Sequence, residues 1–187
     1  MPRTMRTGEA PAVARMLATA LADDPFIRWI AGPNRDRATA WMHAGLTMAE
    51  RHGVVLVDET LEGAAVLMRP GSMPLPVREN LRLLPALVRA VGIHRVPGVL
   101  LALTALEKAH PQEPHWTGLV LGVHPRAQGT GVGRRVIAAA LETVGGDAAY
   151  LEVCDGGPVA LYERFGFAAH ARVEPGHGAP AMTTMRR

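Results

Sequence analysis

The residues best suited to bind a charged ligand form the glycine-rich run Gln-Gly-Thr-Gly-Val-Gly at positions 128–133. An apolar segment, 119–123, precedes this run, and the apolar spacing after it predicts a helix over 131–144. The first amides of a helix have no partner within the helix and lie at the positive end of its dipole, so they attract anions. Glycines let the backbone approach a ligand closely because they have no Cβ. The run therefore predicts a turn that cradles a pyrophosphate.

Two other nucleotide-binding motifs also use glycine-rich turns. A P-loop would need Lys followed by Ser or Thr after its last glycine, but Arg134 and Arg135 follow Gly133, so a P-loop is excluded. A dinucleotide-binding fold would place G-x-G-x-x-G at the first strand–helix turn. Gly129, Gly131 and Gly133 instead give G-x-G-x-G late in the chain. That fold is left as a distant alternative.

The elements that must position this turn follow from apolar periodicity and from turn residues. The expected helices cover 9–22, 36–51, 78–91, 96–109, 131–144 and 158–165. The expected strands cover 54–57, 61–69, 119–123, 150–154, 167–173 and 182–185, the first two as a hairpin. This order predicts an α/β (α+β) single-domain fold, with a mixed, mostly antiparallel sheet flanked by helices on both faces.

Length and composition limit the class of protein. A chain of 187 residues is long enough for one well-packed domain, so we expect a single domain over 1–187. Its longest uncharged apolar run is broken by Pro97 and Gly98 and falls short of the roughly 18 residues of a spanning helix. The first residues lack the apolar block of a signal peptide, and a lone cysteine, Cys154, fits a reducing compartment. We expect a soluble, cytoplasmic protein with no membrane partner.

The basic residues are scattered rather than clustered. Lys108 is the only lysine among 20 basic residues, the net charge is +3, and aromatic residues make up 4% of the chain. A nucleic-acid-binding protein would gather basic side chains on one face, so no nucleic-acid partner is expected. Local sites for an anionic ligand remain open at Arg126, Arg134 and Arg135.

Two motifs resemble the GNAT superfamily of N-acetyltransferases. The run 128–133 matches that family's Q/R-x-x-G-x-G/A signature, and the preceding 119–125 looks like its central strand with a terminal V-x-P. The run Leu-Tyr-Glu-Arg-Phe-Gly-Phe at 161–167 resembles the family's L-Y-x-x-x-G-F segment. The resemblance is specific over about 113–167 and extends elsewhere through the order of elements. It implies the acyl-CoA N-acyltransferase fold.

The resemblance also implies how acetyl-CoA, as cosubstrate, would be held. In this family the central strand and the next strand splay apart, and the pantetheine arm lies between them; Leu121 and Val123 occupy the corresponding strand positions. Backbone amides of the turn would hold the pyrophosphate, and Arg126 and Arg134 either add charge there or are solvated surface arginines. The turn comprises Gln128, Gly129, Thr130, Gly131, Val132, Gly133 and Arg134.

Acetyl transfer needs a neutral amine, a proton acceptor and a donor for the departing thiolate. Tyr162 is the expected acid, because the family commonly has such a tyrosine on the helix after the second splayed strand and a phenol is similar in basicity to a thiolate. The alternative is a packed tyrosine. Glu152 is the first candidate base, because Leu151 and Val153 flank it in a buried strand where a carboxylate needs a partner or a function. A structural carboxylate is the alternative.

Other polar residues leave further alternatives open. Glu113, His115 or a chain of waters could replace Glu152 as the base. His110, His115 and Cys154 lack the short spacing of a metal-ligand pair, so no metal is expected. Cys154 is expected to be a packed thiol rather than a nucleophile. Family members often have Asn where this chain has Asp155, which is expected to cap the following helix but cannot donate an amide hydrogen bond.

The function expected from these features is N-acetyl transfer from acetyl-CoA to a primary amine of a small molecule or protein. A non-catalytic acyl-CoA-binding protein of the same fold is the alternative. We expect the helical segment 72–112 to lie on the acceptor side and 113–167 to form the CoA-binding core. The chain is expected to be a monomer or a homodimer.

Overall fold

A computed structural model describes all residues, 1–187, and contains one seven-stranded sheet. The strands lie in the order β1-β2-β3-β4-β5-β7-β6, and only β4 and β5 run parallel. Their bounds are Arg3–Thr4 (β1), Gly53–Val57 (β2), Gly63–Met68 (β3), Trp116–Val123 (β4), Ala149–Cys154 (β5), Ala168–Val173 (β6) and Met182–Arg186 (β7). The predicted mixed, mostly antiparallel sheet is confirmed.

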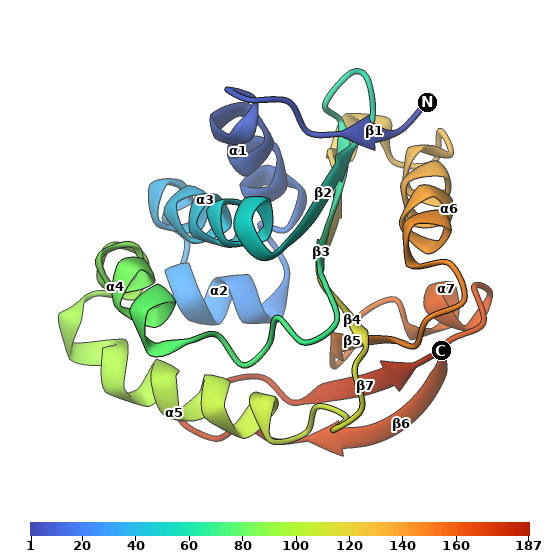
Figure 1. Ribbon diagram of the computed structural model, residues 1–187. Coiled ribbons are helices and arrows are strands. Elements are labelled where there is room, and N and C mark those ends of the chain that lie inside the picture. Colours follow the sequence, from blue (N-terminus) through green and yellow to red (C-terminus); the bar gives the residue numbers. More distant parts are fainter.

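Seven α-helices cover the sheet. They are Ala10–Ala20 (α1), Pro25–Ala31 (α2), Arg35–His52 (α3), Val77–Val91 (α4), Val96–Glu107 (α5), Val132–Val144 (α6) and Val159–Glu163 (α7). Figure 1 shows α1 to α4 on one face of the sheet and α6 and α7 on the opposite face, with α5 running along the end that carries β6 and β7. Short 3-10 turns, Ile93–Arg95 (η1) and Pro125–Ala127 (η2), precede α5 and α6. The predicted helices on both faces are confirmed.

The strand β3 explains why both faces need cover, because all six of its residues are buried. Successive side chains of a strand point to opposite faces. Val66 and Met68 accordingly join a core of 23 buried residues under α1 to α5. Ala65 and Leu67 join a smaller core under α6. A strand buried on both faces fixes the position of β4 beside it, and β4 carries the site described below.

The structure also contains two elements that the sequence pattern did not predict. The first is α2, which begins where the first helix was expected only to end. The Asp24 carboxylate accepts hydrogen bonds from the amides of Phe26 and Ile27 at 3.0 Å, and Pro25 occupies the first turn. This arrangement is a helix-start signal. The second is β1, which has only two residues and is too short to show an alternating pattern.

The helices α4 and α5 follow one another after a short 3-10 turn, and α5 is the more apolar of the two. No single helix is both long and apolar enough to cross a membrane. The pair Val77–Val91 and Ile93–Glu107 would pass on length and composition alone, but the two parts meet at a bend of 113°. Both helices were predicted, at 78–91 and 96–109, and their observed ends lie within two residues of the expected ones.

Candidate active site

The parallel strands β4 and β5 pair over only three residues each. Trp116 to Gly118 lie opposite Ala149 to Leu151, although β4 continues to Val123 and β5 to Cys154. On its other side β4 has a bulge, because Val120 pairs with Val66 of β3 while Gly118 pairs with Leu67. Leu119 therefore has a partner residue on neither neighbouring strand. Beyond it the two strands separate, and their facing backbone groups are left open to a ligand.

A cavity of about 90 Å³ lies at this separation. Leu121 and Leu151 line it from the two strands, Leu141 from α6 and Phe167 from the start of the last hairpin, and 15 of its 17 lining residues are hydrophobic. Tyr162, on α7, and Tyr150 and Glu152, on β5, also border it. Successive side chains of a strand point to opposite faces, so those of Tyr150 and Glu152 lie on the other face of β5 from that of Leu151. The two residues first chosen as acid and base thus border one cavity from opposite faces of the sheet. A mostly apolar cavity with a few polar groups beside it suits an uncharged chain that carries a reactive group.

The glycine-rich turn lies at the start of α6, as predicted. Gly129 and Gly131 have φ values of 77° and 83°, in the left-handed region that favours glycine, and Gly131 is the N-cap. No side chain caps this helix, and its first backbone hydrogen bond runs from Arg135 N to Gly131 O. The amides of Val132 to Arg134 therefore have no partner, and those of Gly129 and Gly131 donate to no backbone oxygen. The turn offers a row of free N–H groups to an anion.

Side chains around the turn hold its shape. Gln128 donates from Nε2 to the carbonyl oxygen of Val123 at 3.2 Å, which ties the turn to the end of β4. Thr130 donates from Oγ1 to Ala127 O at 2.7 Å. Arg126 is paired with Glu62 through an Nε–Oε1 contact of 2.5 Å, whereas Arg134 makes no ion pair or hydrogen bond. Of the two arginines, Arg134 has the freer guanidinium.

Tyr162 lies half-buried against Phe167, with ring centroids 6.1 Å apart in an edge-to-face arrangement. Its hydroxyl group makes no hydrogen bond within the chain, so it is free to meet a ligand in the cavity. Burial, followed by the negative charge of Asp24, raises the pKa of Tyr162 to about 12. The phenol therefore keeps its proton at neutral pH.

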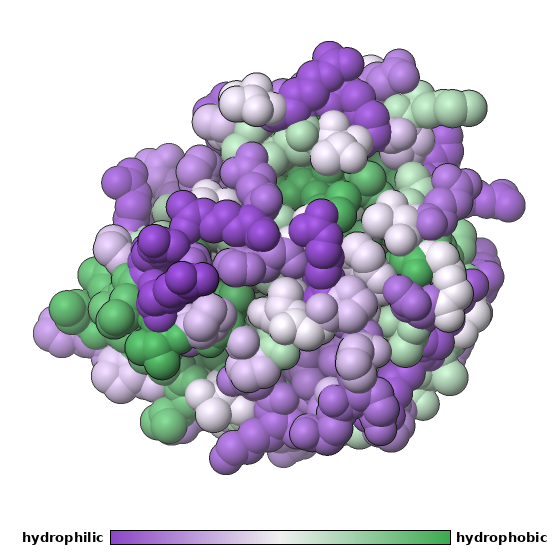
Figure 2. Space-filling view, viewed as in Figure 1, coloured by the Kyte–Doolittle hydropathy of each residue, from purple (hydrophilic) through white to green (hydrophobic).

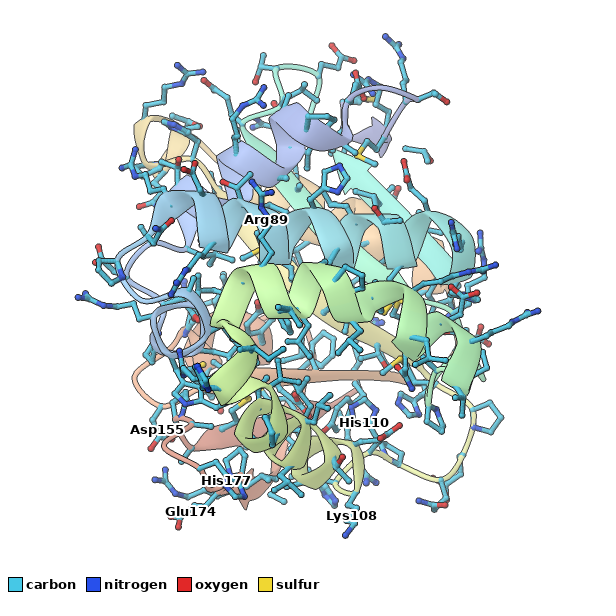
Figure 3. The ribbon with its side chains drawn as sticks, turned by 90° about the vertical axis from the view of Figure 1, so that its left-hand side faces the viewer. Arg89, Lys108, His110, Asp155, Glu174 and His177 are labelled. Atoms are coloured by element: carbon cyan, nitrogen blue, oxygen red, sulfur yellow. The ribbon has the colours of Figure 1, made fainter.

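Glu152 belongs to a cluster of polar and aromatic side chains on the opposite face of β5. Tyr150 donates from its hydroxyl to Glu152 Oε1 at 2.9 Å, and His110 Nε2 lies 3.6 Å from the same oxygen. The rings of His110 and Tyr150 are 4.3 Å apart, and the ring of His115 is 5.5 Å from each. Figure 3 shows His110 beside α5 and below α4. The Tyr150 hydroxyl thus holds the carboxylate by a hydrogen bond, His110 lies just beyond hydrogen-bond distance, and the Glu152 side chain is still 20% exposed.

Comparison with known proteins decides the fold. Residues 93–169 match the family model described as an acetyltransferase (GNAT) domain. The "histone acetyltransferase HPA2 and related acetyltransferase" of Corynebacterium glutamicum is similar over 100% of this chain and 94% of its own, with 24% identity and a TM-score of 0.76. The fold is that of the GNAT acetyltransferases. The resemblance inferred from the two motifs is confirmed.

Two further N-acetyltransferase structures are similar over the whole of this chain. An N-acetyltransferase from Staphylococcus aureus has 12% identity and a TM-score of 0.67, with 100% of its own chain covered. A polyamine N-acetyltransferase from Drosophila melanogaster, which forms N-acetylagmatine, has 17% identity and a TM-score of 0.67, with 98% of its chain covered. At these identities the comparison establishes the shared fold.

The remaining residues expected at the site lie in different places. Leu121 lines the cavity, whereas Val123 lies against the first turn of α6, with Cγ2 3.2 Å from where a Cβ on Gly133 would be. Glu113 is an exposed loop residue whose carboxylate makes no hydrogen bond or ion pair; its backbone carbonyl oxygen is 2.8 Å from His115 Nδ1. His115 lies in the cluster, with a buried Nε2 that has no partner.

Two expectations concern residues at the end of β5, Asp155 and Cys154. Asp155 does not cap α7: its carboxylate pairs with Arg172 at 2.6 Å, and the N-cap of α7 is Pro158, without a side-chain hydrogen bond. Cys154 is buried, as expected for a packed thiol. Burial, followed by the charge of Asp24 with Oδ1 4.0 Å from Sγ, raises the pKa of Cys154 to about 11, so the thiol stays protonated.

Sequence reasoning missed Tyr150 and His110 as members of the site. Tyr150 stands two residues before Glu152 on the same face of a strand, so the period of two could have suggested their contact. His110 comes from the segment after α5 and reaches Glu152 only through the tertiary fold. No spacing in the sequence indicates that contact.

Proposed function

We propose that this protein is an acetyl-CoA-dependent N-acetyltransferase that moves the acetyl group to a primary amine of a small molecule or protein by direct attack on the thioester. The observation that supports this most is that Tyr162 and Glu152 border one cavity from opposite faces of the sheet, at the separation of β4 and β5, in a GNAT fold. The cytoplasm is the proposed location. The oligomeric states open to it are monomer and homodimer.

Acetyl-CoA as cosubstrate fits the groups that the chain offers. The free amides of Gly129 and of Gly131 to Arg134 suit a pyrophosphate, and the unpaired guanidinium of Arg134 adds a positive charge beside them. The strand edges that separate beyond Gly118 offer hydrogen-bonding groups to an amide-containing arm. The apolar lining suits its alkyl parts.

In the proposed reaction Glu152 accepts the proton of the attacking amine, directly or through water. The amine nitrogen bonds to the acetyl carbon and the carbon–sulfur bond breaks. The proton that Glu152 accepted then passes through solvent to the departing thiolate, which leaves as the thiol, so the overall proton count is unchanged. The Tyr150 hydroxyl holds the Glu152 carboxylate in place through Oε1, with His110 beside it, which leaves Oε2 for the proton.

Tyr162 serves the sulfur side of the reaction as a hydrogen-bond donor. Its pKa of about 12 lies roughly 3.5 units above that of an ordinary thiol, so complete proton transfer to a free thiolate would cost about 5 kcal/mol. This differs from the similar basicity expected from the sequence. A neutral phenol that donates to sulfur as the carbon–sulfur bond breaks avoids that cost and still stabilises the developing charge.

The competing function is acyl-CoA binding without catalysis. It needs the glycine turn but neither Tyr162 nor Glu152. The apolar helices of 72–112 are proposed to border the acceptor side, because the segment that follows α5 brings His110 to Glu152. We do not assign one amine as the acceptor.

The test is thiol release from acetyl-CoA with a panel of amines: a polyamine, an arylalkylamine, an amino sugar and a peptide with a free N-terminus. We expect turnover with at least one amine, and a fall of roughly 10²- to 10⁴-fold in kcat for Glu152→Gln. Glu113→Gln is the matched control and should retain activity. Activity that survives Glu152→Gln but is lost in Glu113→Gln would reverse the assignment of the base.

A further inference from the structure

The exposed large hydrophobic side chains of this protein are concentrated in one segment. Apart from Met1, all of them lie between residues 77 and 101. Figure 2 shows this apolar area over α4 and the beginning of α5. We call it the α4–α5 surface; its exposed apolar residues are Val77 (73%), Leu81 (63%), Leu84 (38%), Ile93 (64%), Leu100 (46%) and Leu101 (55%).

The spacing of these residues places them on helix faces that point away from the core. On α4 the exposed apolar positions are 77, 81 and 84, a stripe along one side of a helix. The same side of α4 continues to Val91, one heptad after Leu84, and there it is buried together with Leu87 and Ala90. An amphipathic helix normally buries its whole apolar face, but on α4 only the C-terminal part of that face is buried and the N-terminal part is exposed. The exposed part of the stripe is therefore open to a partner outside the folded chain.

The charges around the α4–α5 surface are mostly positive. Glu79 is a buried carboxylate surrounded by three guanidinium groups, with contacts of 2.6 Å to Arg82, 3.3 Å to Arg51 and 3.8 Å to Arg78. One negative charge cannot neutralise three positive ones, so the cluster retains a positive charge. Arg89, which follows on α4, makes no ion pair; Figure 3 shows it on the same side of the molecule as α4 and α5.

We propose that the α4–α5 surface docks on the surface of a bilayer that contains anionic lipids. Exposed aliphatic side chains would enter the boundary between headgroups and acyl chains, and the arginines beside them would meet lipid phosphates. The stems of the arginines can lie along apolar surface while their charged ends reach the headgroups. The bend of 113° between the helices suits contact with the surface rather than passage through the bilayer.

A second copy of the chain fits this surface less well. A twofold contact would bring the positive clusters of two copies together, and like charges at an interface cost free energy. The proposal changes the expectation of no membrane partner, which was based on the lack of a spanning segment. It does not depend on the proposed catalytic function.

The test is flotation of the full-length protein with vesicles of phosphatidylcholine, with and without roughly one third phosphatidylglycerol. We expect binding to the anionic vesicles that weakens at least fivefold on neutral vesicles and falls with rising salt. Leu81→Ser combined with Leu101→Ser should lower binding roughly tenfold or more. Arg89→Gln should lower it about fivefold on anionic vesicles only, because each basic residue near such a surface contributes about that factor.

The control is Arg15→Gln, an exposed arginine on α1 without an ion pair, which should bind as the unchanged protein does. Because the changed side chains are exposed, circular dichroism and melting temperature should stay the same in every variant. Equal binding to both vesicle types, or no binding, overturns the proposal. Concentration-dependent dimers in sedimentation that are lost with the two Leu→Ser changes, without vesicle binding, would assign the surface to a second copy instead.

Discussion

The contact between Tyr150 and Glu152 allows a quantitative test of how the proposed base is held. Tyr150→Phe removes one hydroxyl, which donates to Glu152 Oε1 at 2.9 Å, and leaves the ring in its place. The ring is 1% exposed, so the change opens almost no new surface. A hydrogen bond to a charged group contributes about 1.5–3 kcal/mol, and the partial exposure of Glu152 reduces this to about 1–2 kcal/mol.

The assay is a double-mutant cycle with Glu152→Met, which removes the acceptor oxygens and keeps an unbranched side chain of similar length. Urea unfolding should show a loss of about 1–2 kcal/mol for Tyr150→Phe in the native background, or a fall in Tm of about 2–8 °C. In the Glu152→Met background the same change should cost less than about 0.5 kcal/mol. An equal cost in both backgrounds would refute the inference that this hydrogen bond holds the carboxylate.

Three further predictions concern the turn, the packing and the acid. Arg134→Gln should weaken acetyl-CoA binding, measured by calorimetry, about 3- to 10-fold. Arg126→Gln should leave the Kd nearly unchanged, because the Arg126 guanidinium is already paired with a carboxylate, and a larger effect at Arg126 would contradict the assignment. Gly63→Ala should destabilise the fold by about 1–3 kcal/mol in urea, because the new Cβ would lie 2.4 Å from the first valine of α6; an unchanged midpoint would show that α6 can shift freely. Asp24→Asn keeps a good helix cap but removes a charge, so the pKa of Tyr162 should fall from about 12 in a spectroscopic titration, and an unchanged or higher value would mean that burial alone sets it.

The features predicted from the sequence are those that depend on neighbouring residues. The glycine turn and the helix after it are set by the local conformations that Gly129 and Gly131 permit, and both have positive φ as the motif requires. Tyr162 was found because its motif follows the second splayed strand. The strands were recognisable because β3 and the 119–123 part of β4 are apolar and turn residues follow them.

The features that were not predicted depend on residues far apart in the chain. His110 meets Glu152 across more than 40 positions, and Arg126 is paired with Glu62, from the hairpin turn before β3. Asp155 pairs with Arg172 of β6 instead of capping the next helix, because the two side chains meet only after β6 has folded back. Ion pairs of this kind follow from tertiary packing and leave no periodic signal in the sequence.

The central claim is that this cavity transfers an acetyl group and does not merely bind the cosubstrate. The most direct measurement compares Tyr162→Phe with the unchanged protein, following both acetyl-CoA binding by calorimetry and thiol release with the best amine of the panel. We predict a Kd within about threefold of the unchanged protein and a kcat lower by roughly 10²- to 10³-fold, with one acetylated amine formed per thiol released. Tight binding of acetyl-CoA by the unchanged protein, without turnover on any amine, would contradict the account and favour a non-catalytic acyl-CoA binder.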